Sequence, residues 1–123
     1  MIITKEYLQN NTKHIFVYGD NLTRKGKGGA AIFRDIPNTY GFLTKKYPNN
    51  LDASFYKPEE YESVFRMELR KLQRYIIDCP DTTWLISKLG SGLANKYSIY
   101  EKIIKPNIVI LKKYNNVKFL YED

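Results

Sequence analysis

Two short apolar segments of this sequence each run directly into a glycine-rich stretch, and this pattern restricts the fold more than any other feature. The first segment is HIFVY at residues 14–18, and four glycines follow it within residues 19–29. The second is TTWLIS at residues 82–87, followed by LGSG at residues 89–92. Runs of β-branched and aromatic residues favour buried strands, and glycine lets the backbone turn or approach a ligand closely. The pattern predicts two buried strands, each leading into an open loop.

The clearest helix in the sequence begins at Pro58, since proline is favoured at a first helical position and two glutamates follow it. Apolar residues then recur at spacings of three and four, and Cys79-Pro80 should end the helix. A short helix is predicted over residues 29–35, ending before Pro37. Helical periodicity returns from Ile99 onward, where Pro106 either kinks one helix or opens a second.

The remaining segments are shorter. Residues 42–44 and 117–121 are typical of brief strands, residues 38–41 of a turn that holds Gly41, and residues 45–56 of a surface loop.

Strands therefore alternate with helices, which indicates an α/β fold with a mixed, mostly parallel sheet. A chain of 123 residues is expected to form a single domain, 1–123. In open sheets of this class, ligands bind beyond the carboxyl ends of the strands. Both glycine-rich loops follow strands, so we expect them to meet at that edge and to hold a small molecule that carries phosphate.

The net charge of +7 and the pI near 9.4 favour anionic partners. Nucleic acid is the alternative partner, but lysine outnumbers arginine fifteen to five and the charge is spread along the chain, as on a solvated surface. One cysteine and one histidine predict neither a metal site nor a cofactor. No apolar run approaches the roughly 18 residues of a membrane span. The start of the chain lacks a signal-peptide layout, so we expect a cytoplasmic protein.

Three common motifs fail on spacing. GKGGAA at residues 26–31 fits the dinucleotide pattern, but seven residues separate it from the preceding strand. A P-loop would need Ser or Thr after Lys27, where Gly28 stands. Ser91 lacks the glycines two positions away that a hydrolase nucleophile elbow needs. Asp20 and Asn21 leave two interpretations open: an Asx turn that satisfies its own backbone, or a pair that binds ligand.

At the two loops the chain resembles a macrodomain, the α/β module that binds ADP-ribose. VYGDN at residues 17–21 with GKGGAAI at residues 26–32 is similar to the first loop and helix of that family, and ISKLGSG at residues 86–92 is similar to its second loop. The chain departs from the family in length, because only about a dozen residues precede His14. Gly19, Asp20 and Asn21 therefore correspond either to the first loop, which we prefer, or to the adenine-contacting motif of macrodomains.

The resemblance implies a macro-like, three-layer fold that binds ADP-ribose or a related nucleotide. It implies that Asn21 meets the distal ribose and, if the protein is an enzyme, that Asn21 is the catalytic residue of an ADP-ribosyl hydrolase. The ligand-binding residues expected from the two loops are Gly19, Asp20, Asn21, Gly26, Gly28, Gly29, Ala30, Leu89, Gly90, Ser91, Gly92 and Leu93. A basic module that binds nucleic acid or protein without catalysis is the alternative, and the oligomeric state is left open.

Overall fold

The computed structural model describes residues 2–122, except for the side chain of Ala30. The chain folds into one small α/β domain whose four strands are all parallel. In chain order the elements are α1 (Lys5–Asn10), β1 (His14–Asn21), η1 (Gly29–Phe33), β2 (Thr39–Lys45), η2 (Asp52–Ser54), α2 (Pro58–Asp78), β3 (Thr83–Ile86), η3 (Tyr100–Ile104), α3 (Lys105–Ile108), η4 (Val109–Lys113) and β4 (Val117–Phe119).

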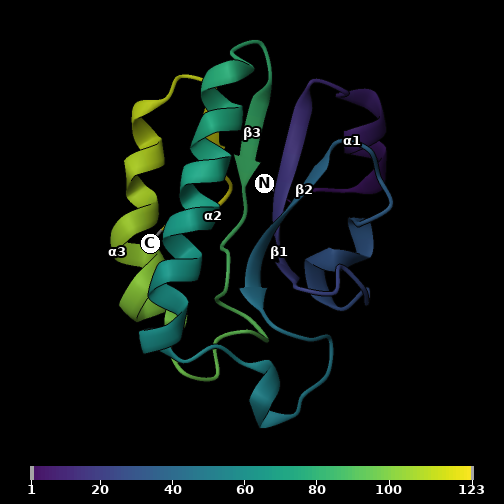
Figure 1. Ribbon diagram of the computed structural model, residues 1–123. Helices are drawn as coiled ribbons and strands as arrows, with labels where there is room; N and C mark the ends of the chain where they lie inside the picture. Colours follow the sequence, from purple (N-terminus) through teal and green to yellow (C-terminus); the bar gives the residue numbers. More distant parts are fainter. Residues whose placement is uncertain (1, 123) are drawn as a thin grey trace.

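The sheet order is β2-β1-β3-β4, so β1 is a central strand with a parallel partner on each side. Helices cover both faces of the sheet: α2 and α3 lie on one side and α1 on the other (Figure 1). The predicted α/β class is therefore confirmed. The sheet is not mixed but wholly parallel among the strands that the structure describes.

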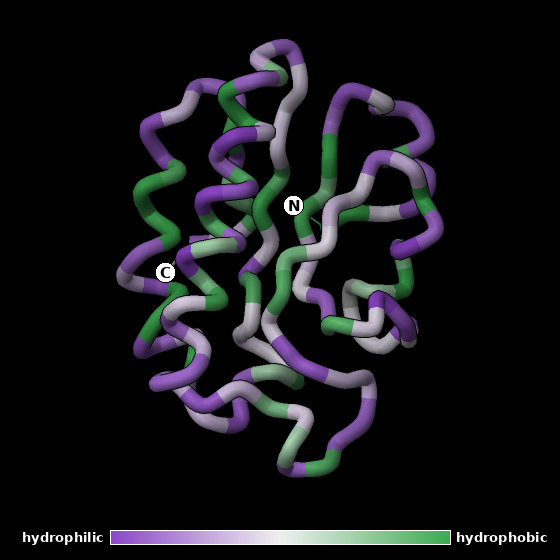
Figure 2. The backbone as a smooth tube through the Cα atoms, in the orientation of Figure 1, coloured by the Kyte–Doolittle hydropathy of each residue, from purple (hydrophilic) through white to green (hydrophobic). Residues whose placement is uncertain are grey.

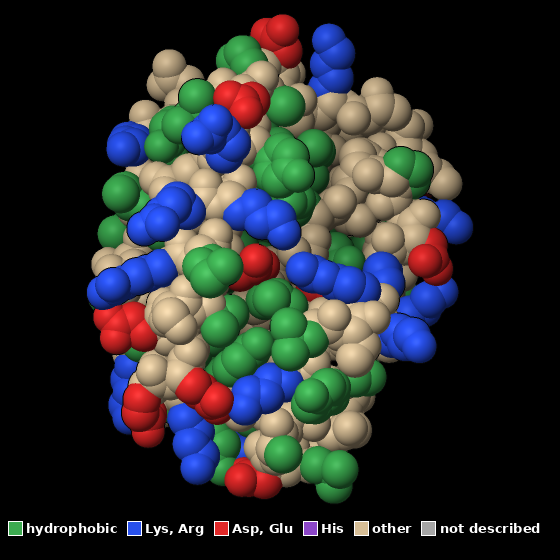
Figure 3. All heavy atoms as spheres, viewed as in Figure 1, with side chains coloured by type: hydrophobic (Ala, Val, Ile, Leu, Met, Phe, Trp, Pro, Cys, Tyr) green, Lys and Arg blue, Asp and Glu red, His purple; other side chains and the backbone are tan. Residues whose placement is uncertain are grey.

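The larger core lies between the sheet and α2. Tyr61, Phe65, Leu72 and Ile76 are buried along one stripe of α2, as the sequence spacing predicts. The hydrophobic segments in Figure 2 run along the strands and the inward side of α2, whereas the exposed side of that helix is hydrophilic. Burial of this stripe holds α2 across the sheet. Figure 3 shows that Lys and Arg side chains are scattered over this outer face and do not form one patch.

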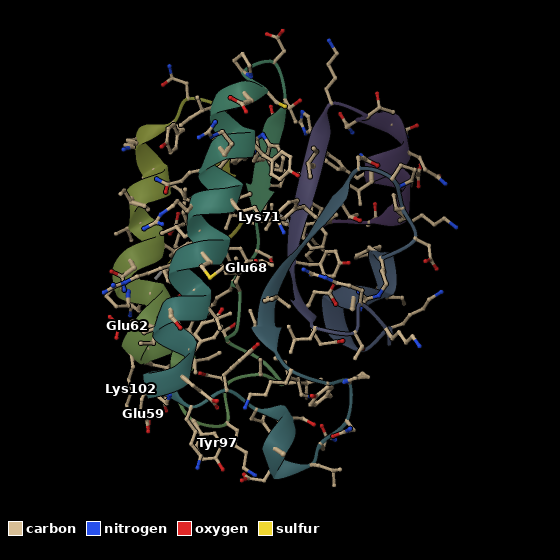
Figure 4. All side chains as sticks on the ribbon, viewed as in Figure 1. Glu59, Glu62, Glu68, Lys71, Tyr97 and Lys102 are labelled. Carbon is tan, nitrogen blue, oxygen red and sulfur yellow. The ribbon has the colours of Figure 1, made fainter. Side chains whose placement is uncertain are left out.

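Strand β2 lies at the edge of the sheet, and α2 satisfies part of its exposed backbone. Glu68 of α2, a buried residue, accepts a hydrogen bond from the Leu43 amide at 2.8 Å. The hydroxyl of Tyr61 donates to the carbonyl of the same Leu43 at 2.5 Å. Figure 4 shows Glu68 on the part of α2 that faces β2. An edge strand with paired backbone groups cannot easily accept a foreign strand there.

Two predicted boundaries are wrong. The first strand continues through Gly19, Asp20 and Asn21, which pair with β2, although the sequence predicts a loop from residue 20. Gly41 lies in β2 opposite Tyr18, not in a turn. A side chain at position 41 would place its Cβ 2.5 Å from a carboxylate oxygen of Asp20, so Gly41 is needed to make room for that carboxylate.

The helical segment after Ile99 is continuous through Pro106 but changes its winding. The π-helix η3 precedes the proline, Pro106 is the second residue of α3, and the 3₁₀ turn η4 follows. Proline lacks an N–H and its ring crowds the preceding turn of a helix. The wider π-helical turn η3 is the turn that the Pro106 ring would crowd. Wider turns of this kind recur at functional sites.

Candidate functional site

A cleft lies at the carboxyl ends of β1, β2 and β3. The connection that leaves β1 leads to β2 on one side, and the connection that leaves β3 leads to β4 on the other side. The pair β1 and β3 is therefore the topological switch point of the sheet, where open α/β sheets bind their ligands. The two glycine-rich loops follow these two strands. In Figure 1 the arrows of β2 and β3 point toward the end of the molecule where these loops lie.

The cleft has a volume of about 390 Å³ and is open to solvent. All the ligand-binding residues expected from the sequence line it, except Ala30. Ala30 belongs to η1, and the surroundings of its side chain lie outside what the structure describes. The further lining residues are Lys25, Lys27, Ala31, Thr44, Lys45, Pro48, Ser87, Lys88 and Ala94. The third wall, formed by Thr44, Lys45 and Pro48 after β2, was not expected from the sequence.

Arg34 fixes the backbone of the first glycine-rich loop through hydrogen bonds to its carbonyl groups. Its guanidinium donates to the carbonyl oxygens of Lys25 at 3.0 Å and of Gly26 at 3.0 and 3.2 Å. It also forms an ion pair with the buried carboxylate of Asp20, at 2.6 Å. Only 14% of the Arg34 side chain is exposed, so these donors have fixed partners. Sequence analysis did not single out Arg34, since its partners are not its neighbours in the chain.

The orientation of these carbonyl groups determines the direction of the next amides. In a trans peptide the N–H points away from the C=O of the same unit. The carbonyls of Lys25 and Gly26 point to Arg34, so the N–H groups of Gly26 and Lys27 point the opposite way. Gly26 has a φ of +87°, and both residues line the cleft. Successive amides in such a turn form a concavity that binds anions.

Asp20 is fully engaged by protein groups. One carboxylate oxygen accepts from the Asn21 amide at 2.8 Å. The other accepts from Arg24 at 3.2 Å, Arg34 at 2.6 Å and Tyr18 at 3.4 Å. Burial, followed by the nearby Asp20 charge, raises the pKa of Tyr18. Asp20 therefore holds the loop in place and has little capacity left for a ligand.

The side chain of Asn21 forms the Asx turn that the sequence left as one of two interpretations. Its carbonyl oxygen accepts from the amide of Thr23 at 3.0 Å and from the Thr23 hydroxyl at 2.6 Å. Its amide donates to the carbonyl of Lys25 at 2.7 Å. A carbonyl oxygen has two lone pairs, and both are occupied here. One N–H of the Asn21 side chain is left for a ligand.

The second glycine-rich loop rests on the helical segment that follows it. Gly90 has a φ of +74°, and a Cβ at this position would lie 2.5 Å from Cδ1 of Ile104 in η3. Ser91 donates from its hydroxyl to the carbonyl of Lys88 at 2.7 Å. Among the described residues, no backbone or side-chain hydrogen bond is donated by the amides of Gly90 and Gly92. These amides remain available to a ligand.

At Gly28 and Gly92 the backbone conformation does not require glycine. Gly28 has a φ of −73°, and among the described atoms an added Cβ would have Cδ1 of Leu93 as its one close neighbour, at 3.9 Å. An added Cβ at Gly92 would meet no atom of the described residues within 4 Å, and Gly92 does not have a positive φ. Both line the same cleft. A glycine in open space at a cleft wall leaves room for a ligand against the backbone.

The charge of the cleft is positive. Four lysines, Lys25, Lys27, Lys45 and Lys88, line it, and Asp20 is the one acidic residue among its lining residues. Lys27 is paired with Asp35 at 2.7 Å on the exposed side of η1. No group of three or more His, Cys, Asp or Glu side chains within the described residues is arranged to hold a metal ion.

The structure does not support an anion site at the start of the helix expected over residues 29–35. The helix that follows the first loop is η1, a 3₁₀ helix of 5 residues rather than an α-helix over residues 29–35. So short a helix has little dipole, and its hydrogen-bond geometry is poorer than that of an α-helix. The amides of the loop itself, turned by Arg34, are the anion-binding groups that the geometry favours.

The fold and the cleft define a protein of the open α/β class with a candidate small-molecule site at its switch point. The chain belongs to a family described as a family of unknown function (DUF7831), whose model matches residues 1–96. Comparison with curated proteins and with solved structures gave no match. All residues that line the cleft lie within the matched segment, whereas η3, α3, η4 and β4 follow it. None of the described helices combines the length and the apolarity needed to cross a membrane.

Proposed function

We propose that this protein binds a phosphate-bearing nucleotide of the ADP-ribose class in the cleft between its two glycine-rich loops. The observation that carries the proposal is the convergence of both loops at the switch point between β1 and β3. The volume of about 390 Å³ lies within the range of small-molecule sites, roughly 300–1,000 Å³. The macro-like resemblance of the loops names ADP-ribose as the first ligand to test.

The groups that line the cleft support an anionic ligand. The amides of Gly26 and Lys27 point away from Arg34, and those of Gly90 and Gly92 have no acceptor among the described residues. Lysines exceed acidic groups on the cleft wall. Backbone donors combined with positive charge suit a diphosphate. The hydroxyls of Thr44, Ser87 and Ser91 donate to backbone carbonyls, so their oxygens can accept hydrogen bonds from the hydroxyls of a ribose.

Binding has more support than hydrolysis. A side chain that positions a water for attack needs a free acceptor, and both lone pairs of the Asn21 carbonyl are taken by Thr23. The proposal is therefore a binding protein, with turnover as a separate experiment. That experiment incubates the protein with a mono-ADP-ribosylated protein and follows release of ADP-ribose by mass spectrometry. Release that is lost in Asn21→Ala, with ligand affinity kept, would replace a binding protein with an enzyme.

The alternative partner, nucleic acid, has less support. Stacking of bases needs aromatic faces that are free beside cations. The ring of Tyr114 already faces Lys113 at 5.2 Å, and the ring of Phe119 faces Lys112 at 5.7 Å. The face in Figure 3 carries dispersed rather than grouped cations. Labelled single-stranded DNA that binds with micromolar affinity at physiological salt would favour this alternative.

The direct test is isothermal titration calorimetry of ADP-ribose with wild type, Gly28→Val, Gly92→Val and Ala53→Val. Ala53 is exposed in η2 and outside the cleft, so Ala53→Val is the matched control for an added valine side chain. Wild type and the control should bind, and both glycine variants should lose at least tenfold in affinity because their side chains fill the cleft. Absence of heat with wild type at low salt would overturn the proposal. Equal affinity of all four proteins would place the ligand elsewhere.

A further inference from the structure

Lys45 is the last residue of β2 and occupies an unusual place on the cleft wall. The pairing of β1 with β2 shifts by one residue there: Asp20 pairs with Leu43, whereas Asn21 pairs with Lys45. Successive side chains of a regular strand point to opposite faces. Because the shift bends the strand end, Thr44 and Lys45 both line the cleft although they are neighbours in sequence.

The ammonium group of Lys45 is held in place but has no counter-ion. It lies 4.7 Å from the centre of the Phe55 ring, a buried aromatic residue. Among the described residues, it forms no ion pair and no hydrogen bond with a side chain. Its neighbours differ: Lys46 is paired with Glu60 at 2.9 Å, and Lys96 with Asp52 at 3.0 Å.

Burial without an anion is unfavourable for a cation. The Lys45 side chain is half-buried, and desolvation lowers the pKa of its ammonium. The face of Phe55 compensates in part, since an aromatic ring attracts a cation, and it also fixes the position of the charge. An anionic group in the cleft would remove the remaining penalty, because an opposite charge nearby favours the charged form of lysine.

Two of the three cations beside the first loop, Arg24 and Lys27, are occupied elsewhere, whereas Lys25 lines the cleft with an exposed side chain and forms no ion pair among the described residues. Arg24 donates to Asp20 at 3.2 Å and to the carbonyl of Gly41 at 3.1 Å. Lys27 is paired with Asp35. Lys45, which comes from another strand, differs from Lys25 because it is half-buried and its ammonium lies over the Phe55 ring, so its charge has a fixed position on this side of the cleft.

We propose that Lys45 is the residue that pairs with a phosphate group of the ligand, between the end of β2 and the amides of Gly26 and Lys27. This inference rests on the proposed function and deepens it. It assigns the phosphate to the β2 side of the cleft, and it makes phosphate recognition depend on one lysine rather than on the loop cations. The remainder of a nucleotide then extends along the cleft toward the second glycine-rich loop.

The test compares Lys45→Met and Lys45→Arg with Lys46→Met, the matched control one residue away. Titrations use ADP-ribose, inorganic pyrophosphate and adenosine, so that phosphate and nucleoside contributions separate. Lys45→Met should keep the fold, since no ion pair is lost, and should reduce the affinity for ADP-ribose and for pyrophosphate at least tenfold. Lys45→Arg should recover part of the affinity, and Lys46→Met should remain within twofold of wild type. Adenosine should bind wild type and Lys45→Met equally.

A second measurement does not depend on which nucleotide binds. Wild type is treated with a low dose of acetic anhydride, and the acetylation of Lys45 and Lys46 is compared by peptide mass spectrometry. Pyrophosphate should protect Lys45 severalfold and leave Lys46 unchanged. ADP-ribose binding that is unaffected by Lys45→Met would overturn the assignment of Lys45 while the proposed function stands. Pyrophosphate binding that needs Lys45, with no binding of ADP-ribose, would overturn the nucleotide assignment and leave Lys45 as the phosphate residue. Failure of both anions to bind would overturn both.

Discussion

The guanidinium of Arg34 lies 2.6 Å from the carboxylate of Asp20, and this pair joins the residue that ends η1 to the end of β1 at the cleft. Asp20 is almost fully buried, and Arg34 uses its other donors on the carbonyls of Lys25 and Gly26. One side chain thus neutralises a buried charge and orients the first glycine-rich loop. The planar fork of arginine is suited to several partners of fixed direction.

Removal of Arg34 should destabilise the fold more than removal of any exposed ion pair. Arg34→Met leaves Arg24 as the one described cation paired with the buried Asp20, and breaking a buried pair costs about 3–5 kcal/mol. Arg34→Lys keeps the charge but not the fork, so it should recover only part of this loss. The measurement is the free energy of unfolding in urea. Arg66→Met, which breaks an exposed pair with Glu62, is the control and should change stability by less than about 1 kcal/mol. Equal losses in the two methionine variants would contradict this role for Arg34.

The two glycines of the second loop should respond differently to alanine. Gly90→Ala requires a positive φ and brings a Cβ to 2.5 Å from Ile104, so we expect a loss of roughly 1–3 kcal/mol from the backbone conformation alone. Gly92→Ala meets open space and should leave stability unchanged or raise it slightly. Thermal unfolding followed by circular dichroism separates the two. If Gly92→Ala destabilises as much as Gly90→Ala, the loop is not arranged as described.

The hydrogen bond between Glu68 and Leu43 should protect the edge of the sheet. Glu68→Leu leaves the Leu43 amide without an acceptor, at a cost of about 1–3 kcal/mol, whereas Glu68→Gln keeps an acceptor oxygen and should cost less. Hydrogen exchange measured by NMR should show faster exchange of the Leu43 amide in Glu68→Leu. An unchanged exchange rate at Leu43 in that variant would show that the amide does not depend on this side chain.

Alkaline pH should destabilise the protein through Tyr40. Burial, followed by the charge of Glu68, raises the pKa of Tyr40 to about 12. A tyrosine in an unfolded chain loses its proton near pH 10, so above about pH 10 the folded state binds more protons than the unfolded state. The contribution of Tyr40 to stability is therefore complete below about pH 10 and is lost as the pH rises to about 12. Tyr40→Phe should flatten the fall in urea stability between pH 9.5 and 11.5, which are roughly the limits of a practical titration around that window. Parallel profiles for variant and wild type would exclude Tyr40 as the source.

The long helix and the α/β class could be predicted because their signals are local. Pro58 and the regular apolar spacing of α2 lie within one stretch of chain, and the helix extends over Pro58–Asp78 as expected. The positions of Gly19 in β1 and of Gly41 in β2 could not be predicted in this way. Both positions depend on contacts with distant residues, Gly19 on Thr44 and Gly41 on Asp20. A glycine next to polar residues is typical of a turn until such a partner is known.

The candidate cleft was predicted in outline, since the rule for parallel strands brings both glycine-rich loops to one edge. Lys45 and Arg34 were missed for a physical reason. Nothing in the neighbouring sequence distinguishes Lys45 from Lys46, because the difference is the presence of Glu60 beside one and Phe55 beside the other. Likewise, the carbonyl partners of Arg34 become evident only when η1 packs against the loop.

The central position of β1 has a consequence for how the chain is made. Its inner neighbour β3 spans Thr83–Ile86, so the segment up to Ile86 must leave the ribosome before β1 can acquire its second partner. Pairing over such long separations is slow, because loop-closure entropy is lost before contacts are gained. Until β3 is available, the nascent β1, which is apolar from Ile15 to Tyr18, has no strand on that side. The cleft needs the loops after both strands, so it can form only after the segment up to Ala94 has been synthesised.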